Sequence, residues 1–333
     1  MPILQQGYEP YRGTVRRGNL RFLAIAAAAL RRNRRWWVWV LLVLALLFGS
    51  AKEYVLVLAV YLPTMLFKAQ PGSVPSFIHA LAEHPRFYTD MMATQSFWAI
   101  VMGVTIGAGE IAEDLRTGGL VFYLGRPVTR LDYVAGKTAA IAAVVAIVTI
   151  APLTILYLTQ ALFEGSWDWL GDHWRVLPAA LGYAAVLSFF VSGIVLGMSA
   201  VARRRLWATV VIAGALIALT VTTWVLAPPN TWTARSEQRQ LHQQLEDAKT
   251  REERKAAWEK FDAALDDLGS ASDTAGWKFL SPVASLTAAA RDVFGNPVPS
   301  NFSGGRHWIL VLGAPLLLFG ALWRRVRAVE VVT

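Results

Sequence analysis

Cysteine is absent from the 333 residues, and charged residues make up only 17% of them. The first absence excludes disulfides, a thiolate nucleophile and any metal site built on cysteine. The second is unusual for a soluble domain, in which about a quarter of the residues are charged. With 55% hydrophobic residues and a mean hydropathy of +0.41, the chain has the composition of a membrane protein.

Motifs for catalysis and nucleotide binding are missing as well. Gly136-Lys137-Thr138 resembles the end of a phosphate-binding loop, but the glycine required five positions before Gly136 is Leu131. Lys137 is therefore expected to reach the cytoplasmic membrane interface with its long side chain. The sequence also has no HExxH pattern and no nucleophile elbow. We predict a chain that is not an enzyme, with no catalytic residues, no metal site and no cofactor of its own.

Long uncharged runs dominate instead. Three of them exceed the roughly 18–20 residues that a helix needs to cross about 30 Å of hydrocarbon, at 138–163, 176–202 and 206–227. Three weaker candidates lie at 36–51, 91–109 and 307–323. The sequence therefore predicts an all-α integral membrane protein with six transmembrane helices. The last four spans carry no Asp, Glu, Lys or Arg, which argues against an ion relay within them.

The arginines orient these spans, because positively charged loops stay in the cytoplasm. More than half of the 32 Lys and Arg residues fall on one side of a six-span arrangement, in residues 1–35, 110–137, 203–205 and 324–327. Both termini are therefore predicted to be cytoplasmic. The net charge of +9 then reflects topology and attraction to anionic membrane lipid. No nucleic-acid partner is expected.

The predicted spans divide the chain into four parts. Residues 1–35 are a cytoplasmic segment whose end is expected to lie along the inner headgroups as an interface helix. Residues 36–227 hold spans one to five, and residues 307–333 hold span six with a cytoplasmic tail. Residues 228–306 form an extracytoplasmic insertion.

The insertion is predicted to be helical. Residues 235–268 are charged and have apolar residues at helical spacing, and residues 276–296 form an amphipathic stretch expected to return along the membrane surface. The insertion could serve as a lid, as a docking site for an extracytoplasmic partner, as a substrate-binding element or as a structural cap.

One apolar stretch, at 54–67, follows the first span after Lys52 and Glu53. A second crossing here would reverse the span at 91–109 and place the loop at 110–137 outside the cell. We expect a single crossing, with 54–67 either continuing a long tilted helix or lying at the outer interface.

The loop at 110–137 lies between two predicted spans and is rich in charge. Glu110, Glu113 and Asp114 are expected in the first turn of a short helix, where the helix dipole favours acids. Gly118 and Gly119 are expected to end that helix. Such an element would form a rigid projection on the cytoplasmic face, suited to the groove of a partner protein.

The segment "IAEDLRTGGLVFYLGRPVTRLDYVAGK" (111–137) resembles the cytoplasmic loop between spans two and three of ABC-2-type permeases, the membrane subunits of bacterial ABC exporters. The positions that match in order are Ile111, Glu113, Asp114, Arg116, Thr117, Gly118, Arg126, Pro127, Val128, Arg130, Gly136 and Lys137. The Leu280-Ser281-Pro282 triplet and the six-span arrangement extend the resemblance over most of the chain. It departs from the family at Gly119–Phe122, where a charged residue often follows the leucine.

The resemblance implies a location in the inner membrane of a bacterium. It also implies a complex of two permease copies, expected to be a homodimer, with two separate ABC ATPase subunits that bind ATP and Mg. It implies that a coupling helix passes the motion of the ATPases to the spans, through Glu110, Glu113, Asp114, Arg116, Thr117 and Gly118. A second cytoplasmic contact is expected at Arg203, Arg204 and Arg205. The substrate path would run between the two copies, and its polar lining is predicted to include Gln95, Ser96 and Thr105.

Two other functions fit the same sequence. A mechanotransmitter would use ATP-driven motion to act on an extracytoplasmic protein through residues 228–306. A membrane scaffold would have no ATPase partner at all. Neither the cargo nor its chemical class is indicated.

Overall fold

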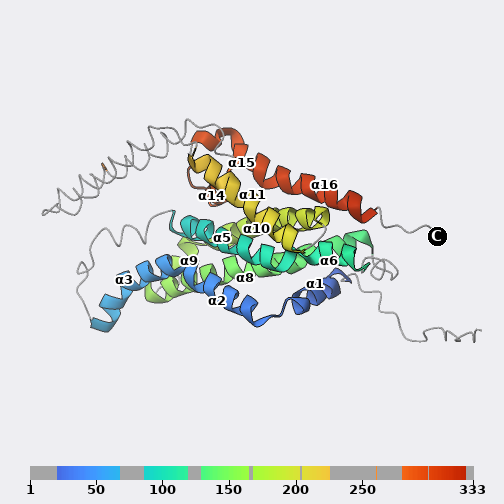
Figure 1. Ribbon diagram of the computed structural model, residues 1–333. Helices are drawn as coiled ribbons and strands as arrows, with labels where there is room; N and C mark the ends of the chain where they lie inside the picture. The colour runs from blue at the N-terminus through green and yellow to red at the C-terminus, as the bar shows by residue number, and fades with distance from the viewer. Residues whose placement is uncertain are drawn as a thin grey trace, which may run out of the picture.

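The computed structural model describes residues 21–67, 86–118, 129–164, 168–202, 205–225, 260, 280–298 and 300–327, and this part of the chain is helical with no strand (Figure 1). Four helical segments are long and apolar enough to cross a membrane. The number becomes five when a bent pair of helices, α2 and α3, is counted as one span. The predicted all-α membrane protein is thereby confirmed.

The observed helices follow the predicted spans closely. The first span is α2 (Trp36–Phe48), continued by α3 (Ala51–Phe67), and the next three are α5 (Phe87–Gly107), α8 (Arg130–Glu164) and α10 (Val176–Val201). The fifth predicted span is α11 (Arg205–Val225), whose apolar part is shorter, at Leu206–Leu219. The count of six spans therefore stays a prediction.

The arginine-rich ends lie together. Figure 1 shows α1 (Arg21–Arg32), α6 (Glu110–Arg116) and the last turns of α16 (Ala314–Arg327) at one end of the bundle, with α9 (Asp168–Asp172) at the other. Arg325 Nη1 donates to the carbonyl of Val201 at the end of α10, over 3.2 Å. This arrangement is the one that the predicted orientation requires.

Glycines set the close packing of α10 inside one subunit. A Cβ atom on Gly193 would lie 2.4 Å from Pro315 Cβ, and one on Gly197 would lie 2.5 Å from Leu318 Cβ, so any larger residue would push α16 away. Gly103 of α5 meets α10 in the same way, at 2.2 Å from Val191 Cγ1. Gly193 and Gly197 are four residues apart on one face of α10, and Gly103 and Gly107 are so on α5. Both faces pack against other helices of the same subunit.

The first span is bent. The two segments Trp36–Phe48 and Ala51–Pro63 make an angle of 43° across a short break. Gly49, at the break, allows the side chain of Gln95 to approach, because a Cβ on Gly49 would lie 2.4 Å from Gln95 Oε1. Residues 54–67 are therefore a bent helical continuation of the first span.

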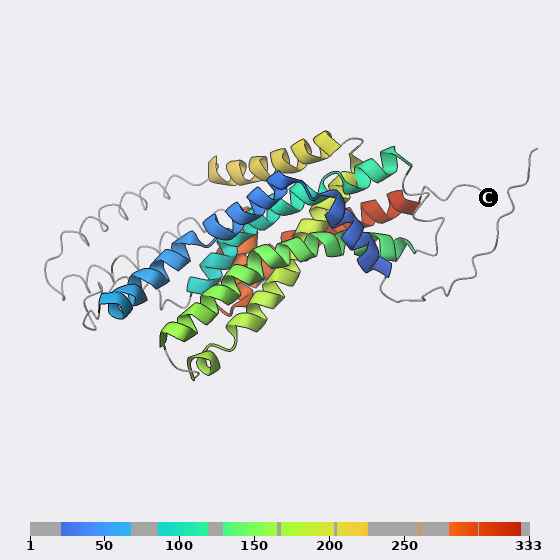
Figure 2. The same ribbon diagram turned by 90° about the horizontal axis from the view of Figure 1, so that it is seen from below.

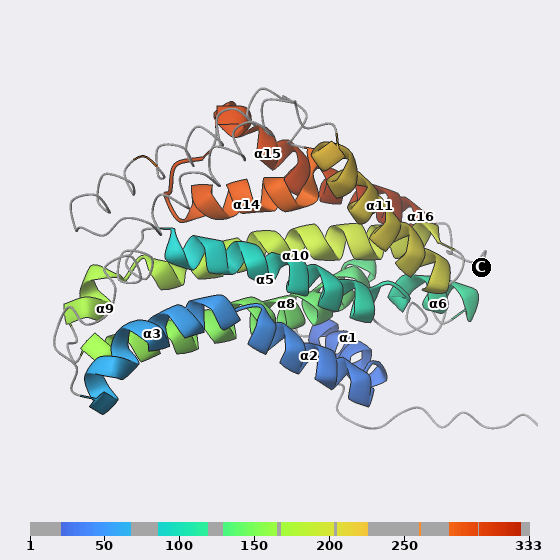
Figure 3. The ribbon, with the colours of Figure 1, turned by 60° about the vertical axis from the view of Figure 1, so that its left-hand side comes forward.

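Part of the predicted insertion is packed into the bundle. It forms α14 (Pro282–Val293) and η3 (Ser300–Gly305). The sixth predicted span then begins with α15 (Arg306–Trp308) and a π-helical turn η4 (Ile309–Gly313) that leads into α16. Figure 3 shows α14 alongside α5 and α10. Ser285 and Ala289 are fully buried, and Tyr183 of α10 donates to the carbonyl of Leu286 over 3.1 Å.

One face of α14 is thus buried against two spans, and the membrane-surface location expected for residues 276–296 stays a prediction. The predicted helix at 235–268 lies outside the described residues, except for Lys260.

Candidate functional site

The short helix α6 is capped at both ends. It follows α5 after Ala108 and Gly109, and glycine has no side chain with which to cap the free amides of the first turn. Ser199 of α10 supplies the acceptor, because its Oγ receives hydrogen bonds from the amides of Ile111 and Ala112 at 3.2 and 3.1 Å. At the other end Gly118 has a φ of +68°, the left-handed conformation that commonly ends a helix.

The inner face of α6 carries two buried acids. Glu110 and Asp114 are one turn apart, and each residue is 4% exposed. Arg32, the last residue of α1, pairs with both: its Nη2 lies 2.5 Å from Glu110 Oε2 and its Nη1 lies 2.9 Å from Asp114 Oδ1. Lys137 of α8 also pairs with both, with Nζ distances of 2.5 Å to Glu110 Oε2 and 2.9 Å to Asp114 Oδ2.

Two neutral side chains complete the hydrogen bonding of these acids. Asn33 Nδ2 donates to Glu110 Oε1 over 2.9 Å, and the hydroxyl of Tyr133 donates to Asp114 Oδ2 over 2.8 Å. Each acid therefore has two cationic partners and one neutral donor. We call these residues the ionic cluster: Arg32, Asn33, Glu110, Asp114, Tyr133 and Lys137.

The ionic cluster has equal numbers of acids and cations, which is the condition under which buried charges are tolerated. Lys137 is 2% exposed, whereas the side chain of Arg32 is 41% exposed and closes the cluster towards solvent. Burial alone would lower the pKa of Arg32, but the hydrogen bonds and negative charges of Glu110 and Asp114 outweigh it and raise the pKa. Arg32 is therefore charged at all physiological pH values.

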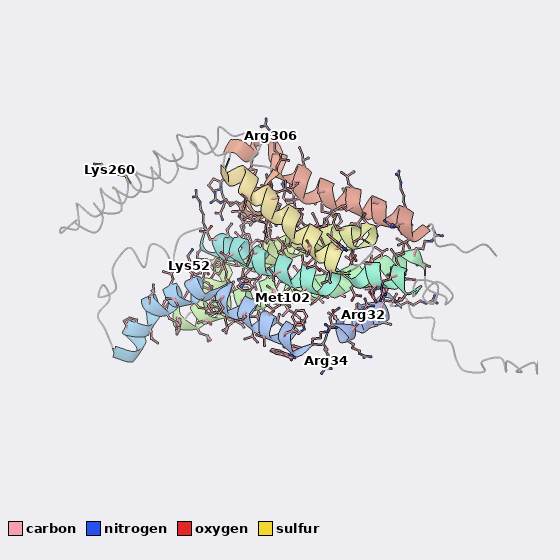
Figure 4. The ribbon with its side chains drawn as sticks, in the orientation of Figure 1. Arg32, Arg34, Lys52, Met102, Lys260 and Arg306 are labelled. Atoms are coloured by element: carbon pink, nitrogen blue, oxygen red, sulfur yellow. The ribbon has the colours of Figure 1, made fainter. Side chains whose placement is uncertain are left out.

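Arg32 belongs to the run Arg31–Arg35, and it forms ion pairs with buried acids inside the protein. Figure 4 shows Arg32 among the side chains between α1 and the α6 end of the bundle, and Arg34 on the outside of the bend between α1 and α2. Topology alone would leave all of these arginines free for lipid headgroups. The structure uses one of them inside the protein.

The Gly136-Lys137 pair brings α1 and α6 to the same point of α8. A Cβ on Gly136 would lie 2.6 Å from Ile25 Cβ and 2.7 Å from the carbonyl oxygen of Phe22, so glycine permits α1 to cross α8 closely (Figure 2). The expectation that Lys137 reaches the membrane interface is wrong. Its ammonium group points inward because two buried carboxylates outweigh the attraction of solvent.

The outer face of α6 is exposed. Arg116 Nη2 lies 2.5 Å from Glu113 Oε1, with 58% and 37% of the two side chains exposed. Thr117 and Gly118 are exposed beside them. The six residues predicted to couple the chain to an ATPase therefore divide into an inner pair, Glu110 and Asp114, and an outward group, Glu113, Arg116, Thr117 and Gly118.

The residues predicted for the substrate path lie on α5. Gln95 is fully buried, and neither atom of its amide has a hydrogen-bond partner among the described residues. Ser96 is also buried, with its Oγ 2.6 Å from the hydroxyl of Tyr183. Thr105 is partly buried. Gln95 and Ser96 thus face the interior of the subunit, and their assignment to a path between two copies remains a prediction.

The predicted second cytoplasmic contact is described only at its end. Arg205 begins α11, while Arg203 and Arg204 lie outside the described residues. In the described ranges no three His, Asp or Glu side chains are placed to hold a metal ion.

Sequence reasoning missed Arg32, Asn33 and Tyr133. The spacing of the residues held one indication of the role of Tyr133. Glu110 and Asp114 are four residues apart, as are Tyr133 and Lys137, so each pair occupies one helix face. The sequence alone does not say that the two faces meet, since that depends on how α6 folds back against α8.

Comparison with known proteins identifies the family of the chain. A family model described as "ABC-2 family transporter protein" matches residues 24–288, which include α6 and the whole ionic cluster. The chain belongs to the ABC-2 transporter family. Neither the curated proteins nor the solved structures contain a match. This ABC-2 protein is a permease subunit of an ABC transporter, and membership implies association with an ABC ATPase.

Proposed function

We propose that this ABC-2 permease is the membrane part of an ATP-driven exporter, and that α6 receives the motion of a separate ATPase. One observation carries the proposal: α6 presents an exposed Glu113–Arg116 pair on one face, while its opposite face is joined by buried charges to α1 and α8. A helix fixed on one side and exposed on the other can receive a force without moving independently of the spans.

In this proposal two copies of the chain form the membrane core, and two ATPase subunits dock below them. The ATPases supply ATP and Mg binding. Nucleotide can shift the spans between inward and outward states only if it binds the two states with different affinity. The ATPase dimer changes shape with nucleotide, and its pressure on α6 would provide that difference. Export as the direction, the inner membrane and the cytoplasmic termini follow from the family resemblance and the arginine distribution.

The test is to co-express the chain with the ATPase encoded next to its gene and to purify the complex. ATPase affinity and ATP hydrolysis are then compared for wild type and Glu113→Ala/Arg116→Ala. We expect the double variant to lose most of the ATPase affinity while the permease stays folded. The matched control is Asp132→Ala, which removes an acid near the start of α8 that accepts hydrogen bonds from Thr129 and interacts with Arg21 of α1.

Three results separate the candidate functions. Loss of affinity in the double variant but not in the control supports docking at α6. If neither change alters ATPase affinity or ATP hydrolysis, the ATPase docks at another part of the permease. If no ATPase associates with wild type, the protein is not an ATP-driven transporter, and the scaffold function takes its place.

A further inference from the structure

The ionic cluster joins three separate helices at one end of the bundle. Arg32 and Asn33 belong to the end of α1, Glu110 and Asp114 to α6, and Tyr133 and Lys137 to α8. These contacts connect residues that are far apart in sequence, by 78 positions for Arg32 and Glu110 and by 27 for Lys137 and Glu110. The cluster therefore makes a tertiary connection between helices that also pack against one another.

Each cation contacts both acids, and each acid contacts both cations. Moving α6 away from α8 would leave Glu110 and Asp114 without Lys137. Moving α1 away would leave the same two acids with Lys137 alone, so that the buried group would have a net negative charge. An uncompensated buried charge is strongly unfavourable, whereas a balanced set with complete hydrogen bonding is tolerated. The arrangement thus favours movement of the three segments together over movement of any one alone.

Two uncharged contacts hold the same segments. Gly136 allows α1 to lie directly on α8, where Ile25, Ala26 and Ala29 are buried. Ser199 caps α6 from α10. The backbone contacts of α1 and α6 therefore keep the cluster residues within reach of one another.

We infer that Arg32 and Lys137 are positioning residues that make α1, α6 and the adjoining end of α8 one rigid unit, so that the interface helix moves with the coupling helix. The inference rests on the proposed function and deepens it, because it names the route of the motion after α6. Force applied to α6 would reach the first and third spans through charge pairs, in addition to reaching the second span through the continuous chain.

The absence of cysteine makes the test direct, since spin labels can be attached at two introduced cysteines alone. Leu23→Cys on α1 and Thr117→Cys at the end of α6 are both exposed sites outside the cluster. The distance distribution between them is measured by pulsed electron–electron double resonance, in the permease and in its ATPase complex. ATPase binding is measured separately on the same variants without labels and with Thr117 retained, because Thr117 belongs to the outward group of α6.

Four proteins with these labels are compared: the otherwise unchanged chain, Lys137→Met, Lys137→Met/Glu110→Gln, and Lys137→Arg. The double variant keeps the net charge of the cluster unchanged and so guards against unfolding caused by an unpaired acid. The arginine variant keeps the charge at position 137. All three are made in the full-length chain.

For the labelled chain with no further substitution we expect a single narrow distance distribution. This distribution should stay unchanged when a non-hydrolysable ATP analogue is added to the complex. Lys137→Met and the double variant should broaden it or add a second maximum, and Lys137→Arg should restore most of the narrow distribution. The inference is overturned if the double variant is as narrow as the unchanged chain, or if nucleotide changes the distance in the unchanged complex. Failure of the ATPase to bind would refute the proposed function, while the distributions of the permease alone would still decide whether the cluster fastens α1 to α6.

Discussion

Two buried acids have hydrogen-bond partners at the α6 end of the segment formed by α5 and α6, but the buried amide of Gln95 in its outer half has none among the described residues. At the α6 end, Glu110 and Asp114 are nearly inaccessible and each has three side-chain partners. In the outer half of α5, Gln95 is equally buried beside the bend at Gly49, yet its amide has no partner in the described part of the chain. Glu53, four residues after Gly49, is also buried; its Oε1 lies 3.7 Å from the Nζ of the exposed Lys52 and has no hydrogen-bond partner among the described residues.

The difference teaches where the molecule resists movement. Separating helices at the ionic cluster breaks several charge-assisted hydrogen bonds, whereas a movement at Gly49 breaks no hydrogen bond of the Gln95 amide within the described part of the chain. Buried polar groups without partners are costly, so a rearrangement that pairs them is favourable. We therefore expect the α6 end to move as a unit and the bend between α2 and α3 to be the place where the first span changes shape.

The largest effect should follow from Lys137→Met, which leaves two buried acids with Arg32 as their only cation. We expect a loss of about 3–5 kcal/mol in the free energy of unfolding, the range for breaking a buried ion pair. Denaturant titration of the purified permease, followed by tryptophan fluorescence, measures it. Lys137→Met/Glu110→Gln should recover part of the loss. If the double variant is less stable than the single one, charge balance does not explain the cluster.

A smaller loss is expected from Gly136→Val, because its side chain would meet Ile25 and the backbone of Phe22. Overpacking of this kind costs about 1–3 kcal/mol. The local consequence is measured by maleimide labelling of Ala29→Cys, which is 3% exposed in the fold. Labelling should become faster in the valine variant. An unchanged labelling rate would mean that α1 is held on α8 without need of the glycine.

The comparison is sharpest for Asn33→Leu against Gln95→Leu, two substitutions of a buried amide by an apolar side chain of similar size. Asn33→Leu removes a donor from Glu110 and should destabilise the fold by about 1–3 kcal/mol. Gln95→Leu removes an amide that has no partner among the described residues, and it should be neutral or stabilising by up to about 1 kcal/mol. Equal destabilisation by the two variants would contradict the distinction between the two ends.

The smallest effect on stability should come from Glu113→Gln. The ion pair with Arg116 is on the exposed face of α6, and exposed pairs contribute about 0–1 kcal/mol. Unfolding should therefore be almost unchanged, and the same titration checks it. A loss as large as that of Lys137→Met would show that this pair has a structural task that its exposure does not suggest.

Much of this architecture was predictable from hydrophobicity and charge. The uncharged runs predicted α8 and α10, and the loop at 110–137 predicted a short helix ended by Gly118, because these features depend on local sequence. Which face of α6 turns inward was not predictable. That depends on the meeting of Arg32, Glu110 and Lys137 from three distant segments, and an arginine near a membrane is equally compatible with lipid contact. The packing of α14 was missed for the same reason, since a half-apolar helix suits a membrane surface and a bundle alike.

One measurement tests the central claim, that the two faces of α6 have separate tasks, most directly. Glu113→Gln and Glu110→Gln each replace one acid of the same helix by its amide, and ATPase affinity and the free energy of unfolding are measured for both variants. The account predicts that Glu113→Gln weakens ATPase binding with the stability of the permease unchanged, and that Glu110→Gln lowers the stability much more than Glu113→Gln does. If the two substitutions change both quantities by the same amounts, the division of α6 into an anchored face and a docking face is wrong.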